Sequence, residues 1–237
     1  MEEISNIEIL TLLEEERDKV YNELRLTNIS RLYKKEYKDI KAGRVLIFDN
    51  GEREMLKDLK RLSADTSHDE SYTKTLKEYK SLDNDELINH FQEELEPVIN
   101  EINLSGKQDE IQALFIEYDF YYHFAGSIEC YGKQDYPIVK APRYITNEVD
   151  YNKQILILES SINFKPAWVD CQEFGSLDYI DPNFKMEKLF ILHSRTLLHK
   201  ALENMNTIGK LNLFCNRPFS FYINEHDSEV MTLYQLT

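Results

Sequence analysis

The spacing of apolar residues changes near residue 107, and this change constrains the fold more than any single motif. Before it, apolar side chains recur every three to four positions, which is typical of helices that bury one face. After it, apolar and polar residues mostly alternate, as in half-buried strands. We therefore expect an α+β fold, with a helical layer over residues 1–107 and an α+β sheet region over residues 108–237. No Pro-rich or Ser-rich linker separates the two regions, so we expect them to pack as one unit.

The clearest helix of the first region begins after Asp83. Asp83 and Glu86 form a capping-box pattern, and one stripe of the following segment is apolar. That stripe contains Leu87, Ile88, Phe91, Leu95, Val98, Ile99 and Ile102. Pro97 predicts a kink or a break in this helix. Further helices are expected over residues 5–26 and 53–80, and a helix with a basic side ends before Gly43.

The second region predicts a mostly antiparallel sheet with one long helix inserted. The helix is expected over residues 183–206, because Asp181 and Pro182 suit its first positions and Gly209 follows its end. Strands are expected over residues 112–122, 127–133, 154–159, 210–215, 219–224 and 229–236. Residues 154–158 lack alternation, which favours a central strand covered on both faces.

Residues 114–132 place acids, tyrosines and a histidine in an alternating pattern. The even positions are apolar and include Cys130, so we expect Cys130 to point into the core rather than to act as a nucleophile. The odd positions form a polar face: Glu117, Asp119, Tyr121, His123, Glu129 and Tyr131. A three-residue loop over residues 124–126 places Gly126 where a left-handed residue is favoured. The resulting register pairs Tyr121 with Glu129, Asp119 with Tyr131 and Glu117 with Lys133.

Three interpretations of this polar face remain open. The first is a solvated strand face with cross-strand pairs between tyrosines, acids and a lysine. The second is a binding face. The third is a catalytic or metal site, because Glu117 and Asp119 lie about 6–7 Å apart along the strand and such a pair can hold a hard cation or share acid–base work.

The remaining aromatic and acidic clusters follow the sheet segments. Trp168 lies in a long connection over residues 163–182, where it can serve as an exposed anchor of a binding site or as a plug at the edge of the core. A terminal hairpin is expected to have a loop over residues 225–228. In that hairpin the residues expected on one inward face are Phe219, Phe221, Ile223, Val230, Thr232 and Tyr234.

The histidines do not form a metal pair in the sequence pattern. His193 and His199 are six residues apart on one helix, which is about 240° of rotation, so they cannot share a ligand. We expect His193 at the core or its edge and His199 on the solvent side. His90 has Glu86 and Glu94 one turn away, an arrangement that suits either a metal or an ordinary exposed face.

Known catalytic patterns are missing from the sequence. No HExxH, GxSxG or Gly-rich phosphate loop occurs, and the three cysteines have no metal or disulfide spacing. We therefore expect no cofactor and no dedicated metal site. The unpaired cysteines, the acidic opening segment and the absence of a long apolar run favour a cytoplasmic protein that does not enter membranes.

The acidic composition gives the leading functional hypothesis. The formal net charge is −15, which disfavours binding to nucleic acid or to anionic lipid. We expect a non-catalytic acidic protein that binds a basic protein, for which an immunity-type inhibitor of a basic toxin is a model in charge alone. The alternative is a metal-dependent enzyme or small-molecule binder that uses Glu117, Asp119 and His123, with Trp168 near them.

Overall fold

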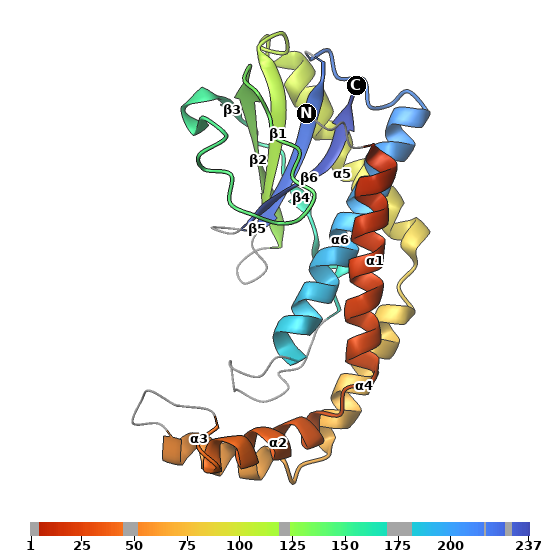
Figure 1. Ribbon diagram of the computed structural model, residues 1–237. Helices are drawn as coiled ribbons and strands as arrows, with labels where there is room; N and C mark the ends of the chain where they lie inside the picture. Colours follow the sequence, from red (N-terminus) through yellow and green to blue (C-terminus); the bar gives the residue numbers. More distant parts are fainter. Residues whose placement is uncertain (1–4, 45–51, 119–123, 170–181, 216, 226–228) are drawn as a thin grey trace. The chain divides into compact units, whose positions relative to one another are not determined.

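The computed structural model describes residues 5–44, 52–118, 124–169, 182–215, 217–225 and 229–237. Within these ranges the chain forms six α-helices and one six-stranded sheet (Figure 1). The helices are α1 (Asn6–Arg25), α2 (Ile29–Lys41), α3 (Glu52–Leu62), α4 (Ser67–Lys80), α5 (Asn84–Leu104) and α6 (Pro182–Thr207). The strands are β1 (Ile111–Tyr118), β2 (Ala125–Gly132), β3 (Gln154–Ile157), β4 (Ile162–Asn163), β5 (Phe219–Glu225) and β6 (Val230–Leu236). The α+β class predicted from the sequence is confirmed.

The chain divides into two compact units. Unit 1 comprises Met1–Arg17, Asp83–Trp168 and Ile191–Thr237, and it contains the sheet. Unit 2 comprises Asp18–Leu82 and Val169–Phe190, and it is helical in its described part. Helices α1 and α6 each contribute residues to both units.

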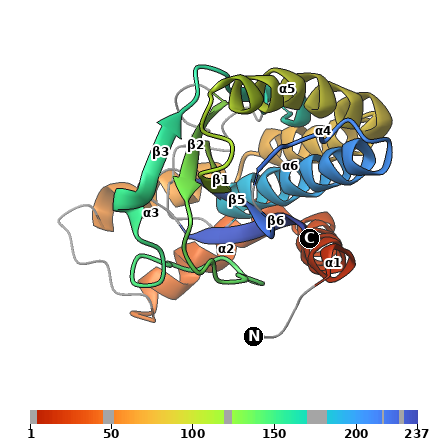
Figure 2. The same cartoon turned by 90° about the horizontal axis from the view of Figure 1, so that it is seen from above.

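The sheet of unit 1 has the strand order β3-β2-β1-β5-β6, and β4 pairs with β2. The pair β1–β5 is parallel, whereas the other pairs between named strands are antiparallel. The sheet is therefore mostly antiparallel, as predicted. Helix α5 and the part of α6 that belongs to unit 1 lie against one face of it (Figures 1 and 2). On that face the rings of Phe91 (α5) and Tyr118 (β1) both contact Phe164, with centroid separations of 5.6 and 5.1 Å.

The other face of the sheet is partly covered by the connection over residues 133–150. Val139, Ile145 and Val149 of this connection are buried. Its backbone pairs with the outer edge of β6, where Val139 bonds to Thr232 and Arg143 bridges to Val230. The side chain of Asn6 adds two more bonds to this edge, one to the carbonyl and one to the N–H of Gln235. This edge of the sheet is thus closed to further strand pairing.

The opposite edge is formed by β3, which corrects the prediction of a central strand over residues 154–158. Ile157 is 59% exposed, so the apolar run does not reflect burial on both faces. The predicted strand over residues 210–215 is wrong, because this segment has no strand structure in its described residues. The short strand β4 was not expected. Helix α5 continues through Pro97, so the predicted break does not occur there.

The predicted hairpin between β1 and β2 has the right faces but the wrong register. Glu117 pairs with Ser127, and Phe115 pairs with Glu129, whereas the sequence favoured Glu117 opposite Lys133. The error arises from Gly126, which the turn pattern assigns to the loop but which lies within β2, opposite Tyr118. A Cβ atom at Gly126 would lie 2.8 Å from Cε2 of Phe164, so close packing explains the glycine. The positive φ angle falls instead on Phe124, at 51°.

In unit 2 the start of α2 is held by a carboxylate from α4. Asp69 accepts hydrogen bonds from the backbone N–H groups of Ile29 and Ser30, at 2.7 and 3.2 Å, and from the Ser30 hydroxyl at 2.7 Å. The Asn28 side chain accepts from the next amide, that of Arg31. The first amides of α2, which lack partners within the helix, are therefore satisfied by side chains. The basic side of α2 is exposed, as the sequence indicated.

No described helix is both long enough and apolar enough to cross a membrane.

Candidate functional site

Two rows of side chains cross the sheet face that lies opposite to α5 and α6. Strand pairing places Glu129, Phe115 and Tyr222 in one row, on β2, β1 and β5. The next row contains Ser127, Glu117 and Asn224 on the same three strands. Because residues that pair across strands share a face, the two glutamates lie on one surface with aromatic residues beside them.

Four residues of these rows, Phe115, Glu117, Glu129 and Asn224, form the floor of a pocket of about 250 Å³, which we call the Tyr/Glu pocket. It is lined by Phe115, Glu117, Glu129, Tyr131, Tyr144, Thr146, Tyr151, Asn224 and Val230. All of these residues belong to unit 1. This set contains two carboxylates and no basic side chain.

Each carboxylate is oriented by a hydrogen bond. The Tyr131 hydroxyl donates to Oε2 of Glu129 in a short hydrogen bond. The amide Nδ2 of Asn224 donates to Oε2 of Glu117 at 3.1 Å. Asn224 is buried, so its amide is a fixed donor rather than a mobile surface group. The two carboxylates are thus held in position by neighbours in the sheet.

The aromatic rings of the pocket meet at steep angles and form walls. Tyr131 and Tyr151 have centroids 5.8 Å apart with planes at 87°, and Phe115 and Tyr131 are 4.9 Å apart at 64°. Phe115 also stacks on Tyr222, at 4.6 Å and 22°. Phe115 and Tyr131 are buried, whereas Tyr144 is 63% exposed and lies at the rim. The polar face predicted from alternation is therefore a half-covered aromatic surface with two acids.

The negative charge of the glutamates acts on the surrounding phenols. Burial, the hydrogen bond to Glu129 and the charge of that carboxylate together raise the pKa of Tyr131 well above its usual value. Burial and the charges of Glu117 and Glu129 also raise the pKa of Tyr151. Both phenols therefore remain neutral at physiological pH, and the charge of the pocket comes from its carboxylates.

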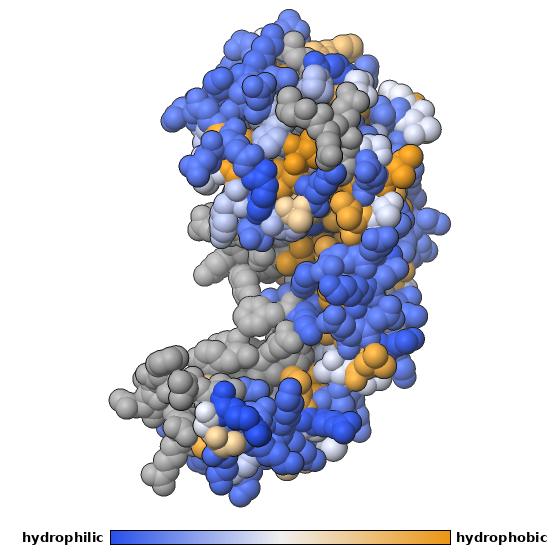
Figure 3. Space-filling view, in the orientation of Figure 1, coloured by the Kyte–Doolittle hydropathy of each residue, from blue (hydrophilic) through white to orange (hydrophobic). Residues whose placement is uncertain are grey.

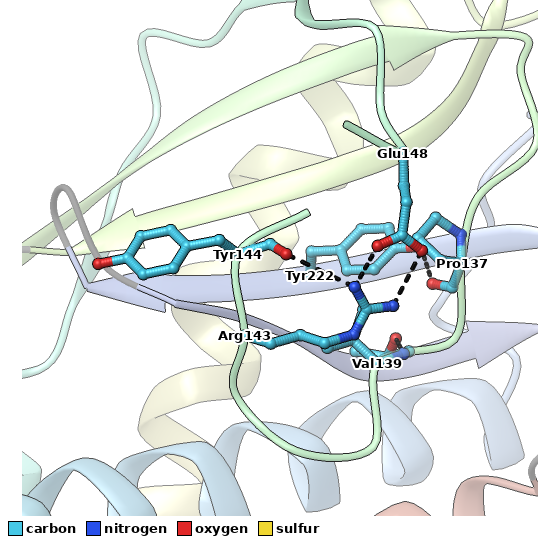
Figure 4. A network of polar contacts seen from close by, with 7 residues as sticks. Pro137, Val139, Arg143, Tyr144, Glu148 and Tyr222 are labelled. Atoms are coloured by element: carbon cyan, nitrogen blue, oxygen red, sulfur yellow. Dashed lines mark hydrogen bonds and ion pairs between the residues drawn. The ribbon is translucent and has the colours of Figure 1, made fainter. Parts of the chain in front are cut away.

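Arg143, in the connection that borders the pocket, is engaged in an ion pair with Glu148. Its Nη2 donates to Oε2 of Glu148 at 2.9 Å, and its Nη1 makes a second, shorter contact with Oε1 (Figure 4). The same view shows the Tyr222 hydroxyl, which donates to the carbonyl of Pro137 at 2.6 Å. The connection is thus attached to the sheet, and its arginine is neutralised within its own segment.

The excess of negative over positive charge in the chain is confined to unit 1. Unit 1 contains 26 Asp and Glu against 11 Lys and Arg, a net charge of −15, whereas unit 2 contains 17 of each kind. The net charge of the whole protein is therefore that of the unit that bears the Tyr/Glu pocket. Hydrophilic side chains cover most of the visible surface around the sheet, with a smaller apolar area among them (Figure 3).

The structure brings together three of the seven site residues predicted from the sequence. Glu117, Glu129 and Tyr131 line the Tyr/Glu pocket. The predicted residues Asp119, Tyr121 and His123 lie outside the described residues. Trp168 is partly buried and its ring lies 5.5 Å from that of Phe124, and it is not among the residues that line the pocket.

Several residues of the pocket were not predicted. Tyr144, Thr146 and Tyr151 come from a connection without periodicity, so no sequence pattern assigns them to a face. Val230 was expected on the opposite face of the terminal hairpin. An irregularity at residues 221–222 of β5 shifts the pairing, so that Val230 lies opposite Asn224 and Thr232 lies opposite Tyr222. A bulge of this kind moves every following residue to the other face.

The described residues do not support a metal site. No group of three or more His, Cys, Asp or Glu side chains within them is arranged to hold a metal ion. Glu94 and His90 of α5, which suited a metal in sequence, instead contact the backbone of Asn163, with Glu94 accepting its N–H at 2.9 Å. Cys130 is buried in the core as predicted, and burial raises the pKa of its thiol to about 12.

A second, open pocket of about 440 Å³ lies beside β3. Its lining contains Asp109 and Glu110 but also Lys133 and Lys153, so its charges offset one another. It therefore lacks the uniform charge that distinguishes the Tyr/Glu pocket.

Comparison with known proteins finds no matching protein family, no matching curated protein and no matching solved structure.

Proposed function

We propose that this chain is a non-catalytic acidic protein that binds a basic protein through unit 1. The observation that carries this proposal is the confinement of the whole net charge of −15 to the unit with the Tyr/Glu pocket. A field of one sign attracts a partner of the opposite sign and speeds its encounter. An immunity-type inhibitor of a basic toxin is one case that this charge distribution fits.

The character of the pocket supports binding more than catalysis. Interface centres are enriched in tyrosine and other aromatic residues, which supply contact area at a small cost in side-chain entropy. The pocket combines such residues with two oriented carboxylates, Glu117 and Glu129. A basic side chain of the partner finds both aromatic surface and opposite charge there.

The proposal is tested by capture from a lysate of the source cells at low salt. The purified protein is immobilised, and a second column carries an unrelated protein of similar net charge. We expect a basic protein to be retained on the first column only and to be released by a salt gradient. The association rate of that protein should fall about tenfold or more between low and physiological salt, because screening weakens electrostatic steering.

The control column separates a specific partner from general ion exchange. Retention of the same basic proteins by both columns would contradict the proposal. So would a retained partner that is acidic or neutral and binds independently of salt.

A further inference from the structure

We propose that the Tyr/Glu pocket binds the guanidinium group of one arginine side chain presented by the basic partner. This inference rests on the function proposed above, and it names the chemical group that the site recognises. It is argued from the size of the pocket, the placement of its carboxylates and the geometry of its rings.

The size of the pocket suits one side chain. Its volume of about 250 Å³ is below the range of roughly 300–1,000 Å³ that holds a drug-sized molecule. The floor of the pocket is rigid, because it lies on the paired strands β1 and β2 and contains the buried side chain of Phe115. A single inserted residue from a partner surface fits these dimensions.

The two carboxylates are spaced for a forked donor. Glu129 lies opposite Phe115, and Glu117 lies opposite Ser127, so the two glutamates are diagonal neighbours on adjacent strands. Such neighbours have Cα atoms about 7–8 Å apart, within reach of one long side chain between them. A guanidinium group presents five N–H donors in a plane, so it can address two carboxylates at once, whereas an ammonium group is a compact point charge.

The aromatic walls favour a flat cation. Guanidinium groups stack on aromatic faces and are more weakly hydrated than ammonium groups, so they lose less on entering a half-buried site. Tyr151 is 39% exposed and its ring stands nearly perpendicular to the buried ring of Tyr131, and the exposed ring of Tyr144 lies at the rim. Cation–π attraction to such rings adds to the attraction of the carboxylates.

The local charges leave the pocket negative. The phenols of Tyr131 and Tyr151 are neutral, and the lining contains no basic residue. Arg143 in the adjoining connection is paired with Glu148. The charge that an arginine side chain meets at this site is therefore that of Glu117 and Glu129.

The test uses three small probes and the whole 237-residue chain with isotope-labelled tyrosine rings. The probes are N-acetyl-arginine methylamide, the corresponding citrulline compound, which has the same shape without the charge, and the corresponding lysine compound. We expect the arginine probe to shift tyrosine resonances, assigned through Tyr131→Phe and Tyr151→Phe variants, in a saturable manner. The lysine probe should bind at least about threefold more weakly, and the citrulline probe should cause no saturable shift.

Variants with matched charge changes test the location of the site. Glu117→Gln and Glu129→Gln should each weaken arginine binding by about tenfold or more, because each removes a charge-assisted contact. Tyr144→Ala should weaken it by about threefold. Glu93→Gln makes the same change in net charge on α5, on the other side of the sheet, and should leave binding within twofold. Circular dichroism and thermal unfolding show whether each variant is folded.

The outcomes separate this inference from the proposed function. Equal binding of arginine and citrulline probes, or an equal loss in the Glu93→Gln variant, would overturn the guanidinium site. A captured basic partner whose affinity is unchanged by the double variant Glu117→Gln/Glu129→Gln would overturn it too, while leaving the proposed function intact. Saturable binding of the arginine probe without any basic partner would keep the site and overturn the proposed function.

Discussion

Glu117 on β1 and Asn224 on β5 meet across the parallel strand pair, where the Asn224 amide donates to the Glu117 carboxylate at 3.1 Å. Asn224 is buried, so the donor that fixes the Glu117 carboxylate belongs to the interior of the sheet and not to the solvent-exposed surface. The neutral asparagine side chain donates a hydrogen bond to the negatively charged Glu117 and adds no charge of its own at this position. The pairing thus connects the stability of the sheet with the charge of the Tyr/Glu pocket.

The variant Asn224→Asp tests this relationship. It places a second carboxylate beside Glu117, and like charges at such a distance disfavour the ionised forms. We expect the free energy of unfolding at pH 7 to fall by about 2–3 kcal/mol, and by less at pH 4.5, where one carboxyl group can be protonated. Urea unfolding at both pH values provides the measurement. Asn89→Asp, at an exposed position of α5, is the control and should change the stability by less than about 0.5 kcal/mol.

The variant Gly126→Ala tests the close packing within β2. The added methyl group would meet Cε2 of Phe164 at 2.8 Å and Cγ2 of Ile116 at 3.1 Å, so core side chains must move. We expect a loss of about 1–3 kcal/mol in unfolding free energy, which is the usual cost of overpacking. Ala125→Ser, at the exposed neighbouring position, should have little effect. A Gly126→Ala protein as stable as the parent would show that the packing at this point is loose.

The buried histidine His193 predicts a loss of stability in acid. Burial, with smaller effects from Arg17 and Lys200, lowers the pKa of His193 to about 4, whereas it is near 6.5 in an unfolded chain. The unfolded state therefore binds a proton first as the pH falls. The stabilising contribution is fully present above about pH 6.5 and is lost as the pH falls towards 4, by about 3 kcal/mol in total.

The measurement compares urea unfolding at pH 7 and pH 4.5 in the parent protein and in His193→Gln. Both proteins lose stability in acid through their carboxylates, so the difference between them isolates the histidine. We expect the loss to be smaller in His193→Gln. An identical loss in the two proteins would mean that His193 does not contribute to the pH dependence.

In unit 2, we expect the stability of α2 to depend strongly on Asp69, a residue of α4. Its carboxylate accepts three hydrogen bonds from Ile29 and Ser30 at the start of α2. Removing it in Asp69→Ala leaves the two backbone N–H groups without their acceptor, whereas the Ser30 hydroxyl keeps the Asp65 carbonyl at 3.1 Å. This should lower the unfolding free energy of unit 2 by about 2–3 kcal/mol. Far-UV circular dichroism during urea unfolding follows this loss. Glu70→Ala, at the adjacent exposed position, should stay within about 0.5 kcal/mol of the parent.

The parts of the fold that local signals determine were predictable from the sequence. Asp83 and Glu86 mark the start of α5, and the Asp83 side chain indeed accepts from the amides of Asp85 and Glu86. Alternation assigned Cys130 to the core and Glu117 and Glu129 to the other face. These assignments depend on residues within a few positions of one another, which is the range over which periodicity is informative.

The predictions that were wrong concern features that depend on contacts between segments distant in the sequence. Position 126 favours glycine because a Cβ atom there would lie too close to the ring of Phe164. A local turn rule gives no information about that contact. His199 was expected on the solvent side, but it is buried and contacts the carbonyl of Leu233 through Nδ1 at 2.6 Å. Tyr144 and Tyr151 line the Tyr/Glu pocket, and their positions follow from the path of the chain between β2 and β3. Sequence periodicity carries no information about that path.

The parallel pairing of β1 with β5 also has a consequence for the order of folding. Residues that pair across these strands are roughly 100 positions apart in the chain, whereas β1 and β2 are joined by a short connection. Closing so long a loop has a high entropic cost, and folding slows as contacts become less local. We therefore expect the β1–β2 hairpin to form early and the β5–β6 hairpin to dock onto it late. Glu129 would then reach its place beside Tyr131 before Glu117 meets Asn224, so the Tyr/Glu pocket would be completed only in the last step of folding.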